Sequence, residues 1–391
     1  MVKSYKHTIF ACYFAYIVQA IVNNFAPLLF LTFHSSFNIP LGQIGLLVTI
    51  NFVTQILVDF CSAKFVDKIG YRKSIVGGLL FAFLGFVSLA FLPEILPPFL
   101  GISISVVLYA IGGGMAEVLV SPILEACPGD EKSAAMSLLH SFYCWGSVLV
   151  IGLSTLLFKI FGIQNWKWIS LGWAIFPLLN AIYFSFVPIN KLVSEDEKMS
   201  DKDLFKNGIF WQLVILMICS GASEQAMSQW ASAFAESGLK VSKTVGDLAG
   251  PCFFAILMGS SRVFHSKVGS KIEIRKYLTC SSFLCVISYL LAVFSPWPLL
   301  SLFGCGLCGL SVAAMWPGTF SLATKSCPKG GTAMFAFLAL AGDIGCSAGP
   351  TIAGFVSSYF GDVLKWGILS GIIFPIIMII VLQFGKKEKR L

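Results

Sequence analysis

Three carboxylic acids lie deep within long apolar stretches of this sequence, away from the ends: Glu117, Glu224 and Asp343. If these stretches cross a bilayer as helices, an ionised side chain at that depth costs at least about 2.5 kcal/mol, so a functional role is expected. Low dielectric disfavours the charged form of a carboxyl group. Each acid is therefore a candidate to bind a proton on one side of the membrane and release it on the other. We predict proton coupling at these acids, and the alternative is an acid that only hydrogen-bonds between helices.

The stretch that holds Glu224 also carries a polar stripe at helical spacing, formed by Gln225, Gln229, Ser232 and Glu236. Amides bind hydroxyls and aromatic rings stack on sugar C–H faces, so such a set suits a neutral polyhydroxylated solute. In lipid, polar faces must turn toward protein or a watery cavity, and hydrogen bonds between helices are the alternative explanation. The predicted solute-binding residues are Gln19, Asn23, Asn24, Asn51, Gln55, His140, Tyr143, Gln225, Gln229, Trp230 and Trp316.

No basic residue is predicted at the centre of an apolar stretch. Lys64, Arg262 and Lys325 are assigned to the cytoplasmic ends of their helices. A site for a phosphate or a carboxylate would be expected to contain a base. The sequence therefore argues against phosphorylated or carboxylated substrates. His140 belongs to the predicted site, although packing is the favoured interpretation for this residue taken alone.

Twelve long apolar segments must position these side chains. Each is long enough to cross a hydrocarbon layer of about 30 Å as a helix of about 20 residues. Hydrophobic residues make up 57% of the chain and charged residues 12%, against about 45–50% and about 25% in soluble proteins. These features predict an all-α membrane protein with twelve transmembrane helices. The segments span residues 8–33, 40–62, 74–92, 98–126, 134–158, 168–188, 208–235, 246–265, 277–295, 299–324, 332–357 and 365–384.

The distribution of positive charge predicts the orientation of the chain in the membrane. Both termini and every second gap are assigned to the cytoplasm. All 27 Lys and Arg residues then lie on that side except Lys159, Lys167, Lys240, Lys243 and Lys365. This agrees with the positive-inside rule. The net charge of +8 is spread over loop ends, which favours orientation and contact with anionic lipid over nucleic-acid binding.

A polar stretch divides the twelve segments into two sets of six. We predict an N-terminal six-helix bundle over residues 1–188, a cytoplasmic linker over 189–207 and a C-terminal six-helix bundle over 208–391. One short echo relates the halves. Cys127-Pro128 and a polar turn lead into the fifth segment, which opens with Ala135-Met136, and Cys327-Pro328 and a turn lead into the eleventh, which opens with Ala333-Met334. A duplicated six-helix unit with a central site is common among secondary transporters.

The loop over residues 63–73 reads AKFVDKIGYRK. It resembles the signature loop of the major facilitator superfamily, Gly-x-x-x-Asp-[Arg/Lys]-x-Gly followed by bases, with departures at Ala63 and Tyr71. The resemblance implies that this loop forms a charge network that latches the cytoplasmic ends of the two halves. For Arg72 and Lys73, the alternative is that they only orient the chain. The predicted latch residues are Asp67, Lys68, Gly70, Arg72 and Lys73.

Within that superfamily the chain resembles the fucose-permease-like branch of sugar/proton symporters. The shared features are the pair Asn23-Asn24 and a run of glycines at 112–114 followed by Glu117 and Pro122. The resemblance implies that Glu117 binds a proton or a sugar. The chain departs from fucose permease after the Asn pair, where residues 25–27 read FAP and the permease has an Asp. This departure argues against fucose itself and against two acids shared between the first and fourth helices.

Cysteines and glycines in the segments are interpreted as packing residues. Cys305 and Cys308 form the pattern C-x-x-C, but they stand in a Gly-rich segment with no second pair or flanking His. Gly112, Gly113 and Gly114 follow no strand, so they predict a close-packing surface and not a nucleotide loop. We expect no metal, no cofactor and no enzymatic activity.

The sequence as a whole predicts proton-coupled symport of a monosaccharide or similar neutral polar solute by alternating access. The expected location is the plasma (inner) membrane, where the chain would work as a monomer with no nucleic-acid partner. One alternative is a proton-coupled exporter of amphipathic compounds, because 36 Phe and ten Met residues could line a greasy cavity. Another alternative is a receptor without transport activity on the same scaffold.

Overall fold

Every regular element that the structure describes is a helix. The computed structural model describes residues 4–128, 132–190, 201–268, 273–327 and 331–385. Contacts divide the chain into two compact units, Met1–Ser194 (unit 1) and Glu195–Leu391 (unit 2). Their boundary falls inside the segment predicted as a linker, and the boundaries of the two predicted bundles stay predictions.

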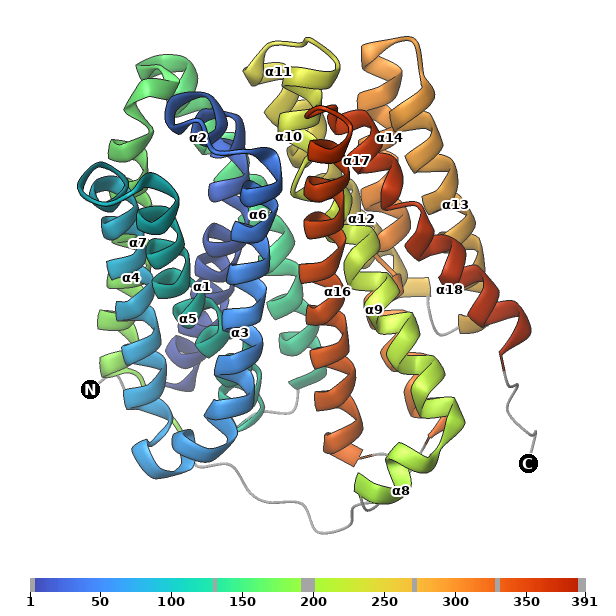
Figure 1. The fold of residues 1–391 in the computed structure, drawn as a ribbon. Coiled ribbons are helices and arrows are strands. Elements are labelled where there is room, and N and C mark those ends of the chain that lie inside the picture. The colour runs from blue at the N-terminus through green and yellow to red at the C-terminus, as the bar shows by residue number, and fades with distance from the viewer. Residues whose placement is uncertain (1–3, 129–131, 191–200, 269–272, 328–330, 386–391) are drawn as a thin grey trace. The chain divides into compact units, whose positions relative to one another are not determined.

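Unit 1 is built from long helices that lie side by side (Figure 1). Its short elements are η1 (Ala26–Leu29), α2 (Phe30–Phe37) and η2 (Ile163–Asn165). Its long helices are α1 (Tyr5–Asn24), α3 (Leu41–Ile69), α4 (Tyr71–Ile95), α5 (Pro98–Glu125), α6 (Lys132–Phe161) and α7 (Trp166–Phe186).

Unit 2 contains more interrupted helices than unit 1 (Figure 1). Its elements up to the middle of the unit are α8 (Asp201–Lys206), α9 (Gly208–Ser228), α10 (Ala231–Ala233), η3 (Phe234–Gly238), α11 (Lys243–Asp247), η4 (Leu248–Cys252) and α12 (Phe253–Val268). The remaining elements are α13 (Ile274–Phe294), α14 (Pro298–Val312), α15 (Met315–Ser326), α16 (Gly331–Tyr359), α17 (Leu364–Ser370) and α18 (Ile373–Phe384).

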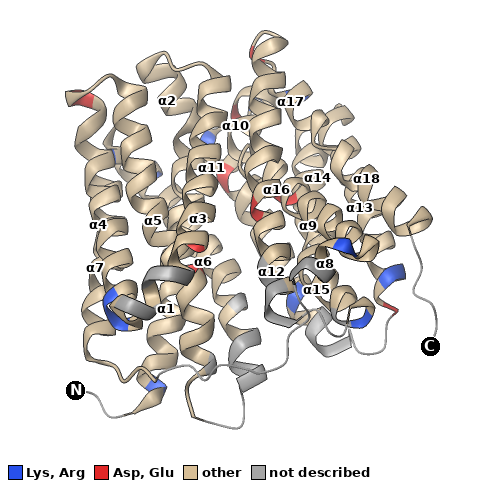
Figure 2. Ribbon diagram, turned by 60° about the horizontal axis from the view of Figure 1, so that its bottom comes forward, with Lys and Arg blue, Asp and Glu red and all other residues tan. Residues whose placement is uncertain are grey.

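Ten helical stretches in the described residues are long and apolar enough to cross a membrane, judged by length and composition. They coincide with ten of the twelve predicted segments. The other two, 246–265 and 332–357, correspond to η4 with α12 and to α16, and α12 alone has only 16 residues. Twelve spans therefore stay a prediction. Figure 2 shows how few residues in these helices are charged.

Prolines explain two breaks that hydropathy did not predict. The predicted segment 8–33 is divided into α1, η1 and α2, because Pro27 has no N–H to continue the helix. The predicted segment 299–324 is divided into α14 and α15, because Pro317 leaves the Ala313 carbonyl without its usual donor four residues later. Arg262 Nε donates a hydrogen bond of 3.4 Å to that carbonyl.

Glycines bring the helices of unit 1 into backbone contact. A Cβ atom added at Gly112 would lie 2.6 Å from the Gly78 carbonyl oxygen, and one added at Gly114 would lie 3.1 Å from Gln55 Cα. The glycine run of α5 therefore packs against α4 and α3 together, as the sequence predicted. The same crowding holds where α4 meets α5 at Gly85, since an added Cβ would lie 2.3 Å from Tyr109 N.

An arginine at the start of one helix covers the carboxyl end of another in both units. In unit 1, Arg72 donates hydrogen bonds of 2.7–2.9 Å to the carbonyls of Phe184, Ser185 and Val187, at the end of α7. In unit 2, Arg275 Nε donates a bond of 2.8 Å to the Leu382 carbonyl, at the end of α18. The last carbonyls of a helix have no partner within the helix and carry partial negative charge, so a guanidinium stabilises them.

The close contact at Gly85 predicts a stability difference between two substitutions in α4. Gly85→Ala should lower the free energy of unfolding by about 1–3 kcal/mol, because the methyl group overlaps the α5 backbone. Gly77→Ala is the matched control, since an added Cβ there has no atom within 4 Å. Thermal unfolding of the two purified proteins in detergent would compare them. Equal midpoints would contradict the tight α4–α5 contact.

Candidate functional site

A hydrogen-bonded polar network joins α1, α3, α5 and α6 in unit 1. Gln19 Nε2 donates to Glu117 Oε2 at 2.8 Å and lies 3.2 Å from Gln55 Oε1. Asn23 Oδ1 accepts bonds of 3.0 Å from both Asn51 Nδ2 and Gln55 Nε2. The unit 1 network comprises Gln19, Asn23, Asn51, Gln55, Glu117 and Tyr143, whose hydroxyl lies 3.5 Å from Asn23 Nδ2.

The unit 1 network is short of hydrogen-bond donors. Gln19, Asn51 and Gln55 are 5%, 6% and 1% exposed, so they have almost no surface on which solvent could bind. Gln19 Oε1 and Asn51 Oδ1 are buried and accept no hydrogen bond from the described residues. A buried acceptor without a donor costs about 1–3 kcal/mol, so this arrangement favours a ligand that brings donors.

Asn24 belongs to the same helix as the network but has separate partners. Its Nδ2 donates to the Ala20 carbonyl at 2.9 Å and to Ser147 Oγ at 3.0 Å. These bonds tie α1 to α6. Asn24 as a solute-binding residue stays a prediction.

Unit 2 brings an acid, two amides and a base together. Gln225 Nε2 donates to Glu224 Oε1 at 3.2 Å, and Gln229 Nε2 donates to Gln225 Oε1 at 2.9 Å. Arg262 Nη2 lies 3.7 Å from Glu224 Oε2, and the two side chains are 22% and 10% exposed. The expectation that no base reaches the depth of the acids was wrong, because the long side chain of Arg262 in α12 extends to Glu224 in α9.

Two predicted tryptophans have different surroundings in unit 2. Trp230 is fully buried, and its indole Nε1 donates to the Pro350 carbonyl at 2.9 Å, which ties the end of α9 to α16. All of its ring surface is covered in this structure, and its role as a stacking plane for solute stays a prediction. Trp316 is half-buried against Gly342, where an added Cβ would lie 2.2 Å from the indole. The neighbouring Asp343 is 5% exposed.

The sequence prediction missed two acids, one partly buried and one fully buried. Asp59 stands four residues after Gln55 in α3 and is partly buried, and its Oδ1 atom has no hydrogen-bond partner. Asp247 in α11 is fully buried, accepts a hydrogen bond from Ser232 and pairs with Lys243 at 3.2 Å. The sequence did contain a signal for Asp59, because a residue four positions after Gln55 lies on the same face of a helix.

The predicted latch lies partly within the described residues. Gly70 has a φ of +91°, which permits the sharp turn between α3 and α4. Arg72 contacts carbonyls of its own unit, and Lys73 is exposed. The side chains of Asp67 and Lys68, like that of the predicted site residue His140, lie outside the described residues. The latch therefore stays a prediction.

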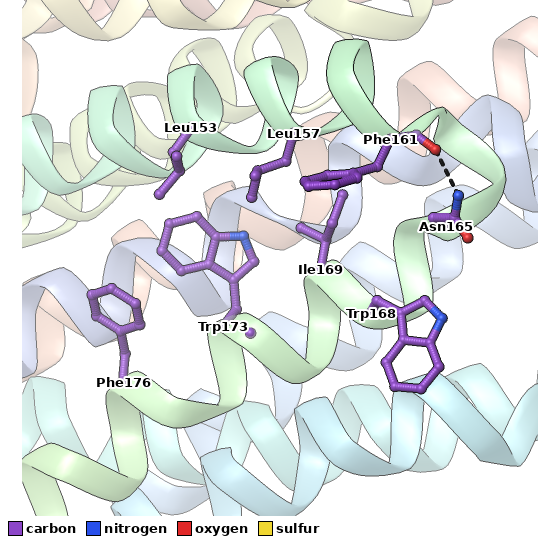
Figure 3. Close-up of a pocket in the computed structure, with 9 residues that line it drawn as sticks. Leu153, Leu157, Phe161, Asn165, Trp168, Ile169, Trp173 and Phe176 are labelled. Atoms are coloured by element: carbon purple, nitrogen blue, oxygen red, sulfur yellow. Dashed lines mark hydrogen bonds between the residues drawn. The ribbon is translucent and has the colours of Figure 1, made fainter.

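One groove in unit 1 is apolar. It has a volume of about 530 Å³ and runs between α6 and α7 (Figure 3). It contains none of the predicted site residues, and its one amide, that of Asn165, donates to the Phe161 carbonyl. Such a surface suits lipid chains and not a polar solute. The lining residues are Leu153, Leu157, Phe161, Asn165, Trp168, Ile169, Gly172, Trp173 and Phe176.

The sequence matches the model of the Major Facilitator Superfamily over residues 9–350 and 239–390. The chain therefore belongs to this superfamily, which confirms the predicted family and identifies a transporter and not an enzyme. Its place in the membrane follows from the family and from the apolar helices. No curated protein sequence matches the chain.

Three solved structures share the fold at low sequence identity. A bacterial homolog of the human lysosomal transporter Spinster, inward-facing and unoccupied, is 13% identical with a TM-score of 0.80, over 98% of each chain. A D-xylose–proton symporter is 14% identical with a TM-score of 0.77, over 98% of this chain and 97% of that one. The E. coli fucose:proton symporter is 16% identical with a TM-score of 0.66, over 98% of this chain and all of that one.

The Glu224–Arg262 pair predicts a measurable coupling energy. Glu224→Gln or Arg262→Gln alone should lower the free energy of unfolding, because each leaves a partly buried charge without its partner. The double variant should recover part of the loss, with a coupling of at least about 0.5 kcal/mol in a double-mutant cycle. Chemical denaturation in detergent would measure it.

The exposed pair Lys276–Glu273 provides the control for this cycle. Its atoms lie 2.8 Å apart, but the side chains are 79% and 60% exposed, so solvent should reduce its coupling. A Glu224–Arg262 coupling no larger than that of the control pair would show that the two groups act independently.

Proposed function

We propose that this transporter couples the movement of protons to the symport of a monosaccharide or similar neutral polar solute by alternating access. The observation that supports the proposal most is the donor shortage of the unit 1 network. Gln19 Oε1 and Asn51 Oδ1 are buried acceptors without donors. A proton on Glu117 would supply the donor for Gln19 Oε1, a sugar hydroxyl would supply the donor for Asn51 Oδ1, and each hydroxyl can also accept from a neighbouring amide.

The proton would bind at Glu117, and Gln19 would connect it to the solute site. Gln19 Nε2 donates to the Glu117 carboxylate. When Glu117 gains a proton, its carboxyl group becomes a donor, and the best partner for that donor is the Gln19 oxygen. Rotation of the Gln19 amide would then direct its NH₂ group toward the solute. In this way the solute and the proton would favour each other's binding.

Unit 2 would supply further solute contacts through Gln225 and Gln229, with Glu224 and Asp343 as additional acids. Arg262 introduces a positive charge at this site, so the absence of a deep base no longer argues against anionic solutes. That charge is already paired with Glu224 at 3.7 Å. A solute carboxylate would have to displace Glu224, whereas a neutral solute leaves the pair intact. The pair therefore favours the neutral solute.

Proton flux in proteoliposomes would test the proposed function directly. Adding a monosaccharide outside vesicles that contain a pH dye should acidify the lumen, and control vesicles without protein should show no change. Alkalinisation of the lumen by cationic amphipathic drugs, beyond that in the protein-free vesicles and with no response to sugars, nucleosides or polyols, would support the exporter instead, because exchange moves a proton out of the lumen as the drug enters. The absence of flux with any solute that shifts the melting temperature would support a receptor without transport activity.

The role of Glu117 predicts a specific defect in Glu117→Gln. The wild-type protein should accumulate solute up to about tenfold across a gradient of one pH unit if one proton moves with each solute. The variant should lose this accumulation and keep solute counterflow, because an amide cannot exchange a proton but still forms hydrogen bonds. Wild-type accumulation in the variant would exclude Glu117 as the coupling acid. Loss of both activities would make it a solute ligand.

A further inference from the structure

Asp59 and Glu117 stand at the same level on two helices that run in the same direction. The chain reverses at Gly70 between α3 and α4, and again at Leu96 and Pro97 between α4 and α5. Two reversals leave α3 and α5 parallel (Figure 1). These helices touch where Gly114 meets Gln55, with an added Cβ only 3.1 Å from Gln55 Cα. Asp59 follows Gln55 by four residues and Glu117 follows Gly114 by three, which is about one helical turn in each case.

The side chains around this contact connect the two acids. Gln55 and Asp59 share one face of α3, because residues four apart lie above one another on a helix. Gln19 lies between Gln55 Oε1, at 3.2 Å, and Glu117 Oε2, at 2.8 Å. The register at Gly114 and Gln55 therefore places Asp59 and Glu117 on neighbouring turns of α3 and α5, and Gln19 of α1 covers Glu117 with one amide. We call Asp59 and Glu117 the carboxylate pair.

This carboxylate pair contains neither a positive charge nor enough donors among the described residues. Neither acid forms an ion pair with a described Lys or Arg. Asp59 Oδ1 and Gln19 Oε1 are both buried acceptors without a donor, and Gln19 is only 5% exposed. One added proton corrects both deficits, because it removes one negative charge and turns a carboxylate oxygen into a donor.

Other titratable groups near the pair come from the helices packed against it. The hydroxyl of Tyr16 in α1 lies 3.4 Å from Ser121 Oγ, one helical turn after Glu117 in α5. Tyr143 in α6 bonds Asn23 at the far end of the network. The side chains of Lys64 in α3 and His140 in α6 lie outside the described residues. Among the described neighbours, only Asp59 can share a proton with Glu117 near neutral pH.

We propose that Asp59 and Glu117 share one exchangeable proton, so that Asp59 is a second coupling acid contributed by α3. This inference rests on the proposed symport and names where its proton is held. Loading takes one proton from water on one side and forms one carboxyl O–H bond. Release breaks that O–H bond and returns the proton to water on the other side. Two like charges in one low-dielectric site titrate as a unit, so the proton belongs to the pair.

Infrared spectroscopy of the purified protein tests the pair without any solute. The difference spectrum between acidic and alkaline buffer should contain a protonated-carboxyl band in the wild-type protein. Asp59→Asn and Glu117→Gln should each remove or shift that same band, because each breaks the shared site. Asp59→Glu should restore it in part. An unchanged band in Asp59→Asn would overturn the proposal.

Asp362→Asn is the matched control for the same chemical change elsewhere. Asp362 has a φ of +62°, which asparagine tolerates, and its Oδ1 atom accepts a bond of 3.1 Å from Ser358 in an exposed turn. This variant should keep the wild-type band and transport. Repeating the titration in sodium chloride and in choline chloride separates two cations. A pair that binds sodium would lose the band and gain thermal stability in sodium chloride, and that result would also overturn the proposal.

Transport assays separate failure of this inference from failure of the proposed function. The wild-type protein should accumulate solute. Asp59→Asn should only equilibrate the solute passively, and it should keep counterflow. Full accumulation in Asp59→Asn would overturn the role of Asp59 and leave the proposed symport intact. If the wild-type protein itself moves no protons with any solute, the proposed function fails. The infrared result then still decides whether the two acids share a proton.

Discussion

A helix in a bilayer has no water with which to bond the polar groups it leaves open, and this constraint organises the chain. Where Pro317 interrupts a helix, the freed Ala313 carbonyl accepts a bond from Arg262. Where α7 and α18 end, Arg72 and Arg275 supply donors to their last carbonyls. Open backbone groups thus find partners within their own unit. In the unit 1 network, by contrast, two side-chain acceptors, Gln19 Oε1 and Asn51 Oδ1, have no partner among the described residues.

In both units an arginine binds the last carbonyls of a helix, but the polar centres of the two units differ. The second residue of α4 and the second residue of α13 are both arginines that cover a later helix end. This correspondence extends the short echo around Cys127 and Cys327 in the sequence. In the centres, unit 2 pairs Glu224 with Arg262, whereas unit 1 pairs Glu117 with no described base. Among the described side chains, Glu117 of unit 1 therefore lacks the opposite charge that Glu224 has in unit 2.

Hydropathy and helical spacing predicted the fold class, and they selected the residues that form the unit 1 network. They could not predict the register between helices. The relation of Asp59 to Glu117 depends on the contact of Gly114 with Gln55, two residues 59 positions apart in the sequence. The contact of Arg262 with Glu224 was missed for a related reason, because hydropathy locates a Cα atom and not the end of a long side chain. Hydropathy did not predict the helix breaks at Pro27 and Pro317, because each interrupted segment is still uniformly apolar.

In the proposed symport, the amide of Gln19 would link the binding of the proton to the binding of the solute within unit 1. An amide presents a donor at one end and an acceptor at the other, so its orientation depends on what each neighbour offers. Gln55 and the Glu117 carboxylate both face its NH₂ group now, and its oxygen is left open. A proton on the acid pair would offer a donor and favour the reversed amide. The NH₂ group would then be free for a solute oxygen, and Gln55 Oε1 would lose the hydrogen bond that it now accepts from Gln19. One side-chain rotation would therefore convert protonation at α3 and α5 into a changed hydrogen-bonding pattern at the amides of α1 and α3. Because such coupling is reciprocal, a solute that prefers the reversed amide must also strengthen the binding of the proton.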